Sequence, residues 1–322
     1  MNNTRPIPLL LLILSLVFNT ACAQDGAPVS TTEALPSSAA TVTSRIDSHF
    51  EPVIRRLVSD GWPEAWVRAK FADTRTEYIP KLWVINARKK SSGVASSSSS
   101  AYAWVNTKES AIACSTFIET YRNEMESAEK KYGVEKETIA ALLRCETRHG
   151  QVTGKYHVFS VFASTALMPV QEYVDQNIAR AREVMKERGA DSVAIEAEVE
   201  WIRARAVKRG NWAYNELVNL LKIERHGHID GMSLYGSWAG AFGWSQFLPS
   251  SYLSRAVDGD GDGRLDLFSP ADAIHSVANY LRDAGYRSGS NSSKRKAIFN
   301  YNNSTPYVNS ILGLAERVRK ME

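Results

Sequence analysis

The chain has 322 residues, a formal net charge of +4, 44% hydrophobic residues and 23% charged residues. This composition excludes a wholly disordered or collagen-like chain, and the small positive charge does not indicate a dedicated nucleic-acid binder. The length suits one large domain or two ordinary ones. We expect a globular monomer with no nucleic-acid partner.

The N-terminal segment has the pattern of an export signal. Arg5 precedes a short apolar run that ends at Phe18, too short to span a bilayer comfortably, and small residues follow. Residues 1–23 are therefore predicted to be a signal peptide, with either an ordinary cleavage site or an outer-membrane lipid anchor on Cys22. Residues 24–43, rich in Ser, Thr, Ala and Pro, are predicted to be a flexible linker. Both alternatives predict an exported, periplasmic protein.

The rest of the chain is predicted to be mainly helical, because almost no stretch alternates in the way a strand does. A Ser-rich surface loop is expected at 91–100, and a capping box at Asn106 and Glu109 is expected to begin one of the helices. The predicted helices cover residues 44–60, 63–71, 107–132, 135–150, 170–209, 212–223 and 270–284.

Two cysteines lie in the predicted helical region. Cys114 and Cys145 could form a disulfide in an oxidising compartment, and the alternative is two buried thiols. Neither their number nor their spacing matches a zinc site.

Glu146 is the most informative acid in the chain. It follows Ile139 and Leu143 by seven and three residues, so its carboxyl is predicted to lie on the core-facing side of their helix. Burial disfavours the charged form and should raise the pKa, as a general acid at neutral pH requires. The alternatives are an ion pair with Arg144, Arg148 or another basic residue, or a helix end that has already turned to solvent.

Residues 236–250 combine three glycines with aromatic and small polar side chains. Trp244 and Phe247 offer stacking faces, while Ser237 and Gln246 offer neutral hydrogen bonds, which is the chemistry of a carbohydrate-binding groove. The alternative is an ordinary aromatic hinge loop. A short later segment adds three candidates of the same kind: Tyr301, Asn302 and Ser304.

An acidic, glycine-rich loop begins at Asp258. Aspartates at positions one, three and five and a glycine at position six match an EF-hand calcium loop, although Ser269 replaces the usual Glu at position twelve. We predict a structural Ca²⁺ site here, and the alternative is an Asp- and Gly-rich surface turn. The predicted ligands are the carboxylates of Asp258, Asp260, Asp262 and Asp272 and the backbone carbonyl of Arg264.

Taken together, these motifs resemble the membrane-bound lytic murein transglycosylase B family, bacterial enzymes with a lysozyme-like catalytic fold. The resemblance rests on residues 146–150, 236–252, 258–280 and 301–304, which occur in the family's order. It implies a mainly α fold related to goose-type lysozyme, with additional N-terminal helices and an embedded EF-hand-like loop. The implied organisation is a signal peptide (1–23), a linker (24–43) and a catalytic domain (44–322) with a lead-in (44–104), a core (105–322) and the calcium loop (258–272).

The resemblance also implies an activity. Glu146 would be the sole catalytic acid/base, and the β-1,4 bond between N-acetylmuramic acid and N-acetylglucosamine of peptidoglycan strands would be cleaved without water, leaving 1,6-anhydromuramic acid ends. Family members often carry a pair of arginines soon after the catalytic Glu, but residues 165–173 contain none. The residues implied to line the sugar groove are Ser237, Gln246, Phe247, Tyr301 and Asn302.

Two other functions stay open at this point. One is a catalytically inactive wall-binding protein that keeps the groove. The other is a lysozyme-type hydrolase, which needs a second carboxylate beside the scissile bond. Glu200, Glu224 and Asp230 are acids for which the sequence indicates no partner.

Overall fold

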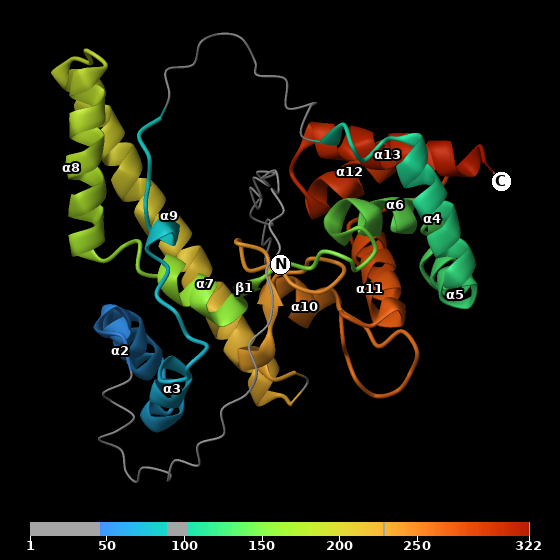
Figure 1. Cartoon of the computed structure of the whole chain (residues 1–322), viewed down its shortest axis with the longest axis horizontal. Coiled ribbons are helices and arrows are strands. Elements are labelled where there is room, and N and C mark those ends of the chain that lie inside the picture. The colour runs from blue at the N-terminus through green and yellow to red at the C-terminus, as the bar shows by residue number, and fades with distance from the viewer. Residues whose placement is uncertain (1–45, 89–101, 228, 322) are drawn as a thin grey trace, which may run out of the picture.

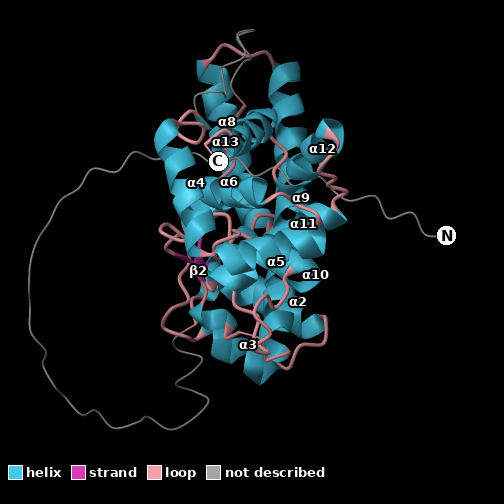
Figure 2. Ribbon diagram, turned by 90° about the vertical axis from the view of Figure 1, so that its right-hand side faces the viewer, coloured by secondary structure: helices cyan, strands magenta, loops and turns pink. Residues whose placement is uncertain are grey.

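A computed structural model describes residues 46–88, 102–227 and 229–321. Helices make up nearly all of the regular structure in these ranges, and one antiparallel pair joins β1 (Tyr156–His157) to β2 (Tyr235–Gly236) (Figure 2). The predicted signal peptide, linker and Ser-rich loop lie outside the described residues.

The helices gather around two hydrophobic clusters, which Figure 1 shows as two groups side by side. The first cluster is built by amphipathic helices and by α7, whose side chains are buried all round. Its elements are η1 (Ser48–Phe50), α2 (Glu51–Ser59), α3 (Glu64–Phe71), η2 (Pro80–Leu82), α7 (Val158–Thr165), α8 (Gln171–Glu187), α9 (Ser192–Arg225), η4 (Gly231–Ser233) and α10 (Pro249–Arg255).

The second cluster surrounds a central helix, which packs against four neighbours. Its elements are α4 (Lys108–Thr120), α5 (Arg122–Tyr132), α6 (Lys136–Thr147), α11 (Pro270–Asp283), α12 (Asn291–Tyr301) and α13 (Thr305–Arg319). The central helix, α6, is the one that carries Glu146.

The prediction of one helix over 107–132 was wrong, because Tyr121 breaks it with a ψ of 41° and separates α4 from α5. The predicted capping box was also wrong. Thr107 is the N-cap, and its hydroxyl accepts a hydrogen bond from the Ser110 amide, whereas the Asn106 side chain accepts one from Arg317.

The predicted helices over 170–209 and 212–223 also differ from the structure. The chain turns at Gly189, which has a φ of +69°, and then continues as the single 34-residue helix α9. Gly210 does not end it. A Cβ there would stand 2.2 Å from the Pro169 ring, so this glycine permits a close crossing rather than a helix end.

The two clusters meet at the loop that precedes α10 and at the residues that follow it. The Thr147 hydroxyl at the end of α6 donates to the Trp244 carbonyl (3.0 Å), and the Tyr301 hydroxyl donates to the Ser245 carbonyl. The Val257 amide donates to the Ser276 hydroxyl of α11 (3.0 Å). Glu146 therefore lies at the border between the two clusters.

Candidate active site

Glu146 lies in the last turn of α6. The helix ends here because two of the following residues adopt a left-handed backbone conformation. Arg148 and His149 follow in the left-handed region, with φ of 53° and 59°, and their amides bond back to the carbonyls of Arg144 and Leu143. The buried face upstream holds the carboxyl at the edge of the core, so Glu146 is half-buried, as the apolar spacing predicts.

The surroundings of Glu146 favour its neutral form. Burial raises the pKa of this carboxyl to about 7, although the Tyr307 hydroxyl donates a hydrogen bond of 2.5 Å that lowers the pKa in part. Tyr307 is itself fully buried, which holds the pKa of its phenol well above the usual range. The carboxyl can therefore both give and take a proton near neutral pH.

The alternative of a structural ion pair is wrong for the described residues. The Arg144 guanidinium donates to the Ser110 hydroxyl (3.4 Å), and the Arg148 guanidinium lies 5.3 Å from the centre of the Trp104 ring. Neither forms an ion pair with Glu146.

The rest of the motif after Glu146 fixes the end of α6. The neutral His149 ring stacks on Phe117 at 4.1 Å, and its Nε2 donates to the Ala140 carbonyl (3.0 Å). Burial lowers the pKa of this imidazole to about 4, so it carries no charge at neutral pH. The Thr147 hydroxyl accepts from the Gly150 amide (2.9 Å). These contacts fix the position of Glu146 at the end of α6.

Hydrogen bonds between side chains and the backbone hold the predicted sugar-binding loop in place. Ser237 and Gln246 are half-buried in it. The Gln246 side-chain amide donates to the carbonyls of Thr153 and Gly243, each at 3.0 Å, and the Ser237 hydroxyl accepts from the Ala241 amide (3.2 Å). Both side chains are thus fixed, with further hydrogen-bonding capacity left on each.

Trp244 and Phe247 are placed by packing. The Trp244 ring lies beside Phe117 at 6.2 Å and so close to Gly150 that a Cβ there would clash. Phe247 is only 2% exposed and lies 5.9 Å from the Tyr301 ring. Phe247 therefore packs against Tyr301 and exposes almost none of its own ring.

The segment that joins α12 to α13 brings Tyr301, Asn302 and Ser304 to the same region. Ser304 caps α13, and Asn302 is only 3% exposed. Neither the Asn302 Oδ1 nor the buried hydroxyl of Ser245 has a hydrogen-bond partner among the described residues. A buried acceptor without a donor costs about 1–3 kcal/mol, so such groups call for an explanation.

Three functional candidates were missed by the sequence analysis. Tyr307 and Tyr102 stack edge to face 5.5 Å apart beside Glu146, where no motif marks them. Arg209 of α9 lies 5.8 Å over the Trp238 ring, next to Ser237. Arg209 is far from Glu146 in sequence because α7, α8 and the first half of α9 lie between them. The available signal was the pair Arg205 and Arg209, four residues apart in α9.

The acids that seemed to lack partners have them. Glu224 pairs with Lys70, the Asp230 carboxylate lies 3.7 Å from the Arg75 guanidinium, and Glu200 lies 3.9 Å from Arg203. Within the described ranges, no hydrogen bond joins Glu146 to a second carboxylate.

Both described cysteines are free thiols, so the disulfide alternative is wrong; Cys114 is buried, as the other alternative predicts, and Cys145 is partly exposed. Burial raises the pKa of Cys114 to about 12, and the Cys114 sulfur lies 3.9 Å from the His149 Nε2. Cys145, beside Glu146, also has its pKa raised by burial. Both thiols stay protonated and unreactive at neutral pH.

The acidic loop brings together three of its four predicted carboxylates. Ligand oxygens of Asp258, Asp260 and Asp272 lie within 4.8 Å of one another. Asp262 is outside this group, and its carboxylate instead accepts a hydrogen bond from the Arg264 amide (2.7 Å). The cluster therefore contains Asp272, the acid beyond the usual twelve-residue loop.

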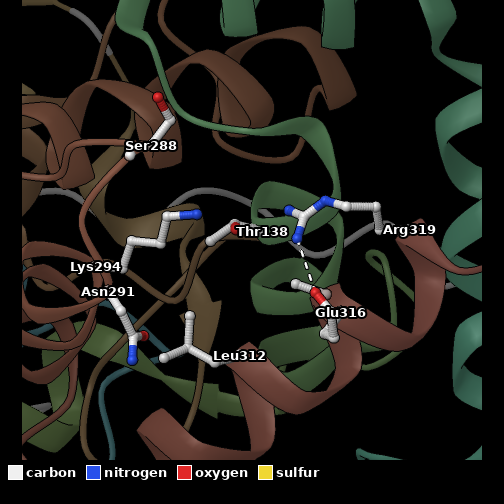
Figure 3. Close-up of a pocket in the computed structure, with 9 residues that line it drawn as sticks. Thr138, Ser288, Asn291, Lys294, Leu312, Glu316 and Arg319 are labelled. Carbon is white, nitrogen blue, oxygen red and sulfur yellow. Dashed lines mark hydrogen bonds and ion pairs between the residues drawn. The ribbon is translucent and has the colours of Figure 1, made fainter.

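A cavity of about 370 Å³ lies at the opposite end of α6 (Figure 3). Thr138, Lys294 and Arg319 point toward one another across it. Its charges are matched within the protein, because Lys294 pairs with Glu135 and Arg319 lies 3.0 Å from Glu316. This cavity lacks the unpartnered acid that distinguishes the Glu146 region.

The fold and the site define a helical, lysozyme-like protein whose central helix carries a half-buried acid with no cation partner among the described residues. The chain belongs to the transglycosylase SLT domain family, whose model matches residues 46–295. The membrane-bound lytic murein transglycosylase B of Escherichia coli (strain K12) is 32% identical over 173 residues, which are 54% of this chain. The matched segment spans 38% of that relative's length.

Solved structures agree on the fold. The Escherichia coli lytic transglycosylase SLT35 in complex with bulgecin A is 20% identical, with a TM-score of 0.62 over 85% of this chain and 93% of that one. Pseudomonas aeruginosa SltB3 in complex with NAG-NAM-pentapeptide is 18% identical, with a TM-score of 0.60 over 84% and 78%. SLT35 was also solved in complex with calcium, with a TM-score of 0.61 at 20% identity over 85% and 93%. The predicted family and the mainly α, lysozyme-like fold are confirmed.

Proposed function

We propose that this protein is a peptidoglycan lytic transglycosylase that uses Glu146 as its single acid/base. One observation supports this above the others: a half-buried carboxyl with a pKa near 7 whose bonded partner is a phenol, and whose pKa no neighbouring carboxylate charge shifts. A hydrolase of the usual kind needs two carboxylates. One acid suffices when the substrate itself supplies the nucleophiles.

The proposed reaction has two steps. Neutral Glu146 gives its proton to the glycosidic oxygen between N-acetylmuramic acid and N-acetylglucosamine, while the 2-acetamido oxygen of the muramic acid stabilises the cation that develops at C1. The Glu146 carboxylate then takes the proton of the C6 hydroxyl, whose oxygen bonds to C1. The acid is restored, the 1,6-anhydro ring closes and no water is consumed. Tyr307 stabilises the carboxylate between the two steps.

The polar groups without partners suggest how the sugar is oriented. The Asn302 Oδ1 is a buried acceptor, which suits the N–H of an acetamido group or the C6 hydroxyl as its donor. Ser237 and Gln246 would bond ring substituents, and the Tyr301 ring would line the groove. Arg209, stacked on Trp238, has no acid partner in the described part of the chain and would bind the carboxylate-bearing side of the substrate.

The test is mass spectrometry of the fragments released from purified peptidoglycan by the mature protein and by Glu146→Gln. Anhydro products, lighter than lysozyme products by one water and absent with the variant, are expected. Full-mass reducing ends would instead establish hydrolysis. Stoichiometric binding to peptidoglycan without products from the unmodified protein would establish the wall-binding alternative.

We also propose that the acidic loop holds Ca²⁺ in a structural role. The clustered carboxylates offer the hard oxygen ligands that Ca²⁺ prefers. A Cβ on Gly259 would stand 2.4 Å from the Ala271 carbonyl, so the loop packs tightly against the start of α11, which supplies Asp272. Ca²⁺ would tie this loop to α11 without entering the reaction.

Removal of Ca²⁺ is expected to lower the melting temperature by about 5 °C, because a ligand bound only by the folded state stabilises that state. Differential scanning calorimetry with a chelator and with added Ca²⁺ measures this effect. Asp258→Asn is the matched variant and should melt at the chelator value in both conditions. A melting temperature unaffected by chelation would exclude the site.

Export to the periplasm is the remaining part of the proposal, and it rests on the N-terminal sequence alone. No helix of the described residues is long and apolar enough to cross a membrane. Cys22→Ser separates the two alternatives for anchoring. Loss of membrane fractionation in this variant would establish the lipid anchor, and unchanged release into the soluble fraction would exclude it.

A further inference from the structure

The helix α3 has apolar residues on two opposite sides. Val67 and Phe71 face the first hydrophobic cluster and are almost fully buried. Four other apolar residues, in the helix or just before it, follow one another at helical spacing on the opposite side and are each exposed or half-buried: Trp62, Ala65, Trp66 and Ala69. We call these four residues the α3 outer face. Figure 1 and Figure 2 both show α3 at the lower extremity of the described part of the chain.

The two indoles of the α3 outer face stack on each other. Their ring centroids are 5.5 Å apart and their planes differ by 15°. The Arg225 guanidinium lies 5.9 Å from the centre of the Trp62 ring, and the Lys70 ammonium lies 5.2 Å from the centre of the Trp66 ring. Each indole thus has the other indole against one face and a cation over its ring. Little of either face is therefore free to stack on a sugar.

The polar edges of these indoles remain open. Within the described ranges, neither the Trp62 nor the Trp66 N–H donates to a protein acceptor, and neither is buried, unlike the N–H of Trp212. A tryptophan that packs part of its ring inward and keeps its N–H accessible suits a boundary between an apolar and an aqueous phase. The exposed part of the pair therefore fits the headgroup level of a lipid bilayer better than it fits a sugar ring.

Two exposed cations border the α3 outer face. Lys222 and Arg225 lie three residues apart in the last turn of α9, and no carboxylate of the described residues forms an ion pair with either. Three acids of this region are bonded within the protein: Asp60 to Tyr214, Glu64 to Arg68 and Glu224 to Lys70. The charges of Lys222 and Arg225 therefore remain available to an anionic surface.

We propose that the α3 outer face, together with Lys222 and Arg225, docks the protein on an anionic phospholipid membrane. In the docked state the two indoles lie at the level of the lipid headgroups, the alanines beside them let the helix approach closely, and the two cations bind lipid phosphates. Docking is separate from the reaction at Glu146 and needs no acyl chain. An anchor at Cys22, where present, strengthens it, because two contacts then hold one chain to one membrane.

The test measures co-sedimentation of the exported protein with vesicles of phosphatidylethanolamine and phosphatidylglycerol at low salt. All proteins carry Cys22→Ser, so that no acyl chain contributes. Lys222→Gln with Arg225→Gln removes the two cations at the α3 outer face and leaves the hydrophobic clusters intact. Arg205→Gln with Lys208→Gln removes two cations from the middle of the same helix and is the matched control.

A second pair of variants tests the indoles. Trp62→Gln with Trp66→Gln removes both rings of the α3 outer face. Trp104→Gln with Trp201→Gln removes two partly exposed rings elsewhere and is the matched control. Melting temperatures are compared first, and if the Trp62 and Trp66 variant does not fold, the cation variants decide the outcome.

The unmodified protein is expected to sediment with the vesicles, and each outer-face variant is expected to bind about tenfold more weakly than its control. On vesicles of phosphatidylcholine alone, the two cation variants are expected to bind alike. Failure of the unmodified protein to sediment would overturn the proposal, and so would equal binding by an outer-face variant and its control.

Binding to peptidoglycan sacculi distinguishes a membrane from the cell wall as the partner. The Trp62 and Trp66 variant is expected to bind sacculi as the unmodified protein does. A tenfold loss on sacculi would overturn the proposal, because the α3 outer face would then serve the wall. Anhydro product formation from isolated peptidoglycan tests the reaction at Glu146 separately and is expected to be unchanged in both outer-face variants.

Discussion

The two ends of α6 carry two glutamates with opposite environments. Glu135, at the N-terminal end, accepts hydrogen bonds from the Lys294 ammonium and from the Tyr286 hydroxyl. Glu146, in the last turn, is bonded to the Tyr307 hydroxyl, and no cation pairs with it within the described ranges. A buried tyrosine hydroxyl donates a hydrogen bond to each carboxyl, so the two sites differ in whether a cation is also present.

This difference separates an acid stabilised by a cation from an acid that lacks this stabilisation. At Glu135 a positive charge offsets the cost of burying the carboxylate. At Glu146 nothing offsets that cost, and the pKa rises to about 7. One carboxylate at an end of α6 is therefore paired with a cation, and the other has no cation partner among the described residues.

The largest expected effect is the loss of activity in Glu146→Gln. The amide keeps the shape of the side chain but cannot give or take a proton, so the rate of anhydro product release should fall by about 10³-fold or more. The Glu135→Gln variant serves as the control and should retain most of the rate. Comparable losses in both variants would remove the distinction between the two ends of α6.

The next effect concerns the pH dependence of stability. The native pKa of Glu146, about 7, exceeds the ordinary carboxyl value of 4.5. Between these values the native state holds a proton that the unfolded state has released. The protein should therefore lose up to about 3 kcal/mol of unfolding free energy as the pH rises from 4.5 to 7. Urea unfolding across this range measures it, and Glu146→Gln should lack this component. Parallel pH curves for the two proteins would contradict the raised pKa.

A smaller loss of stability is expected in Glu135→Gln, about 2 kcal/mol at pH 7. The substitution leaves the Lys294 ammonium and the nearby Arg319 guanidinium without the carboxylate that they surround. Chemical denaturation measures the effect. If Glu135→Gln were as stable as the unmodified protein, the Glu135 cluster could not be considered structural.

The sequence was sufficient to predict the helical class, the family and the acid. These depend on local patterns: the apolar stripe before Glu146, the glycine-rich loop and the alternating aspartates. The prediction from sequence failed where contacts between residues distant in the chain decide the local structure. Gly210 has the local signal of a helix end, yet it lies within α9. A glycine is needed there because a Cβ would clash with Pro169. The break at Tyr121 has no glycine or proline to mark it.

The candidate site was predictable only in part, for the same reason. Glu146 and the loop that contains Gln246 could be found from motifs. The partner that adjusts the pKa of Glu146 could not, because Tyr307 is 161 residues away and belongs to an ordinary apolar helix face. Arg209 was missed because α7, α8 and the first half of α9 separate it from Glu146 in sequence, whereas in the structure it lies over the Trp238 ring of the predicted sugar-binding loop.

The smallest and most specific effect is expected in Tyr307→Phe. The hydroxyl of Tyr307 favours the ionised carboxylate, so its removal should raise the pKa of Glu146 by about one unit. The protonated form would then persist to higher pH. The alkaline limb of the profile of kcat/KM against pH should therefore move to higher pH by the same amount. Tyr286→Phe is the matched control, because its hydroxyl is bonded to Glu135 at the other end of α6. That variant should lose stability and keep the original pH profile. An unmoved profile in Tyr307→Phe, or an equal movement in both variants, would show that the pH dependence comes from a group other than the Glu146–Tyr307 pair.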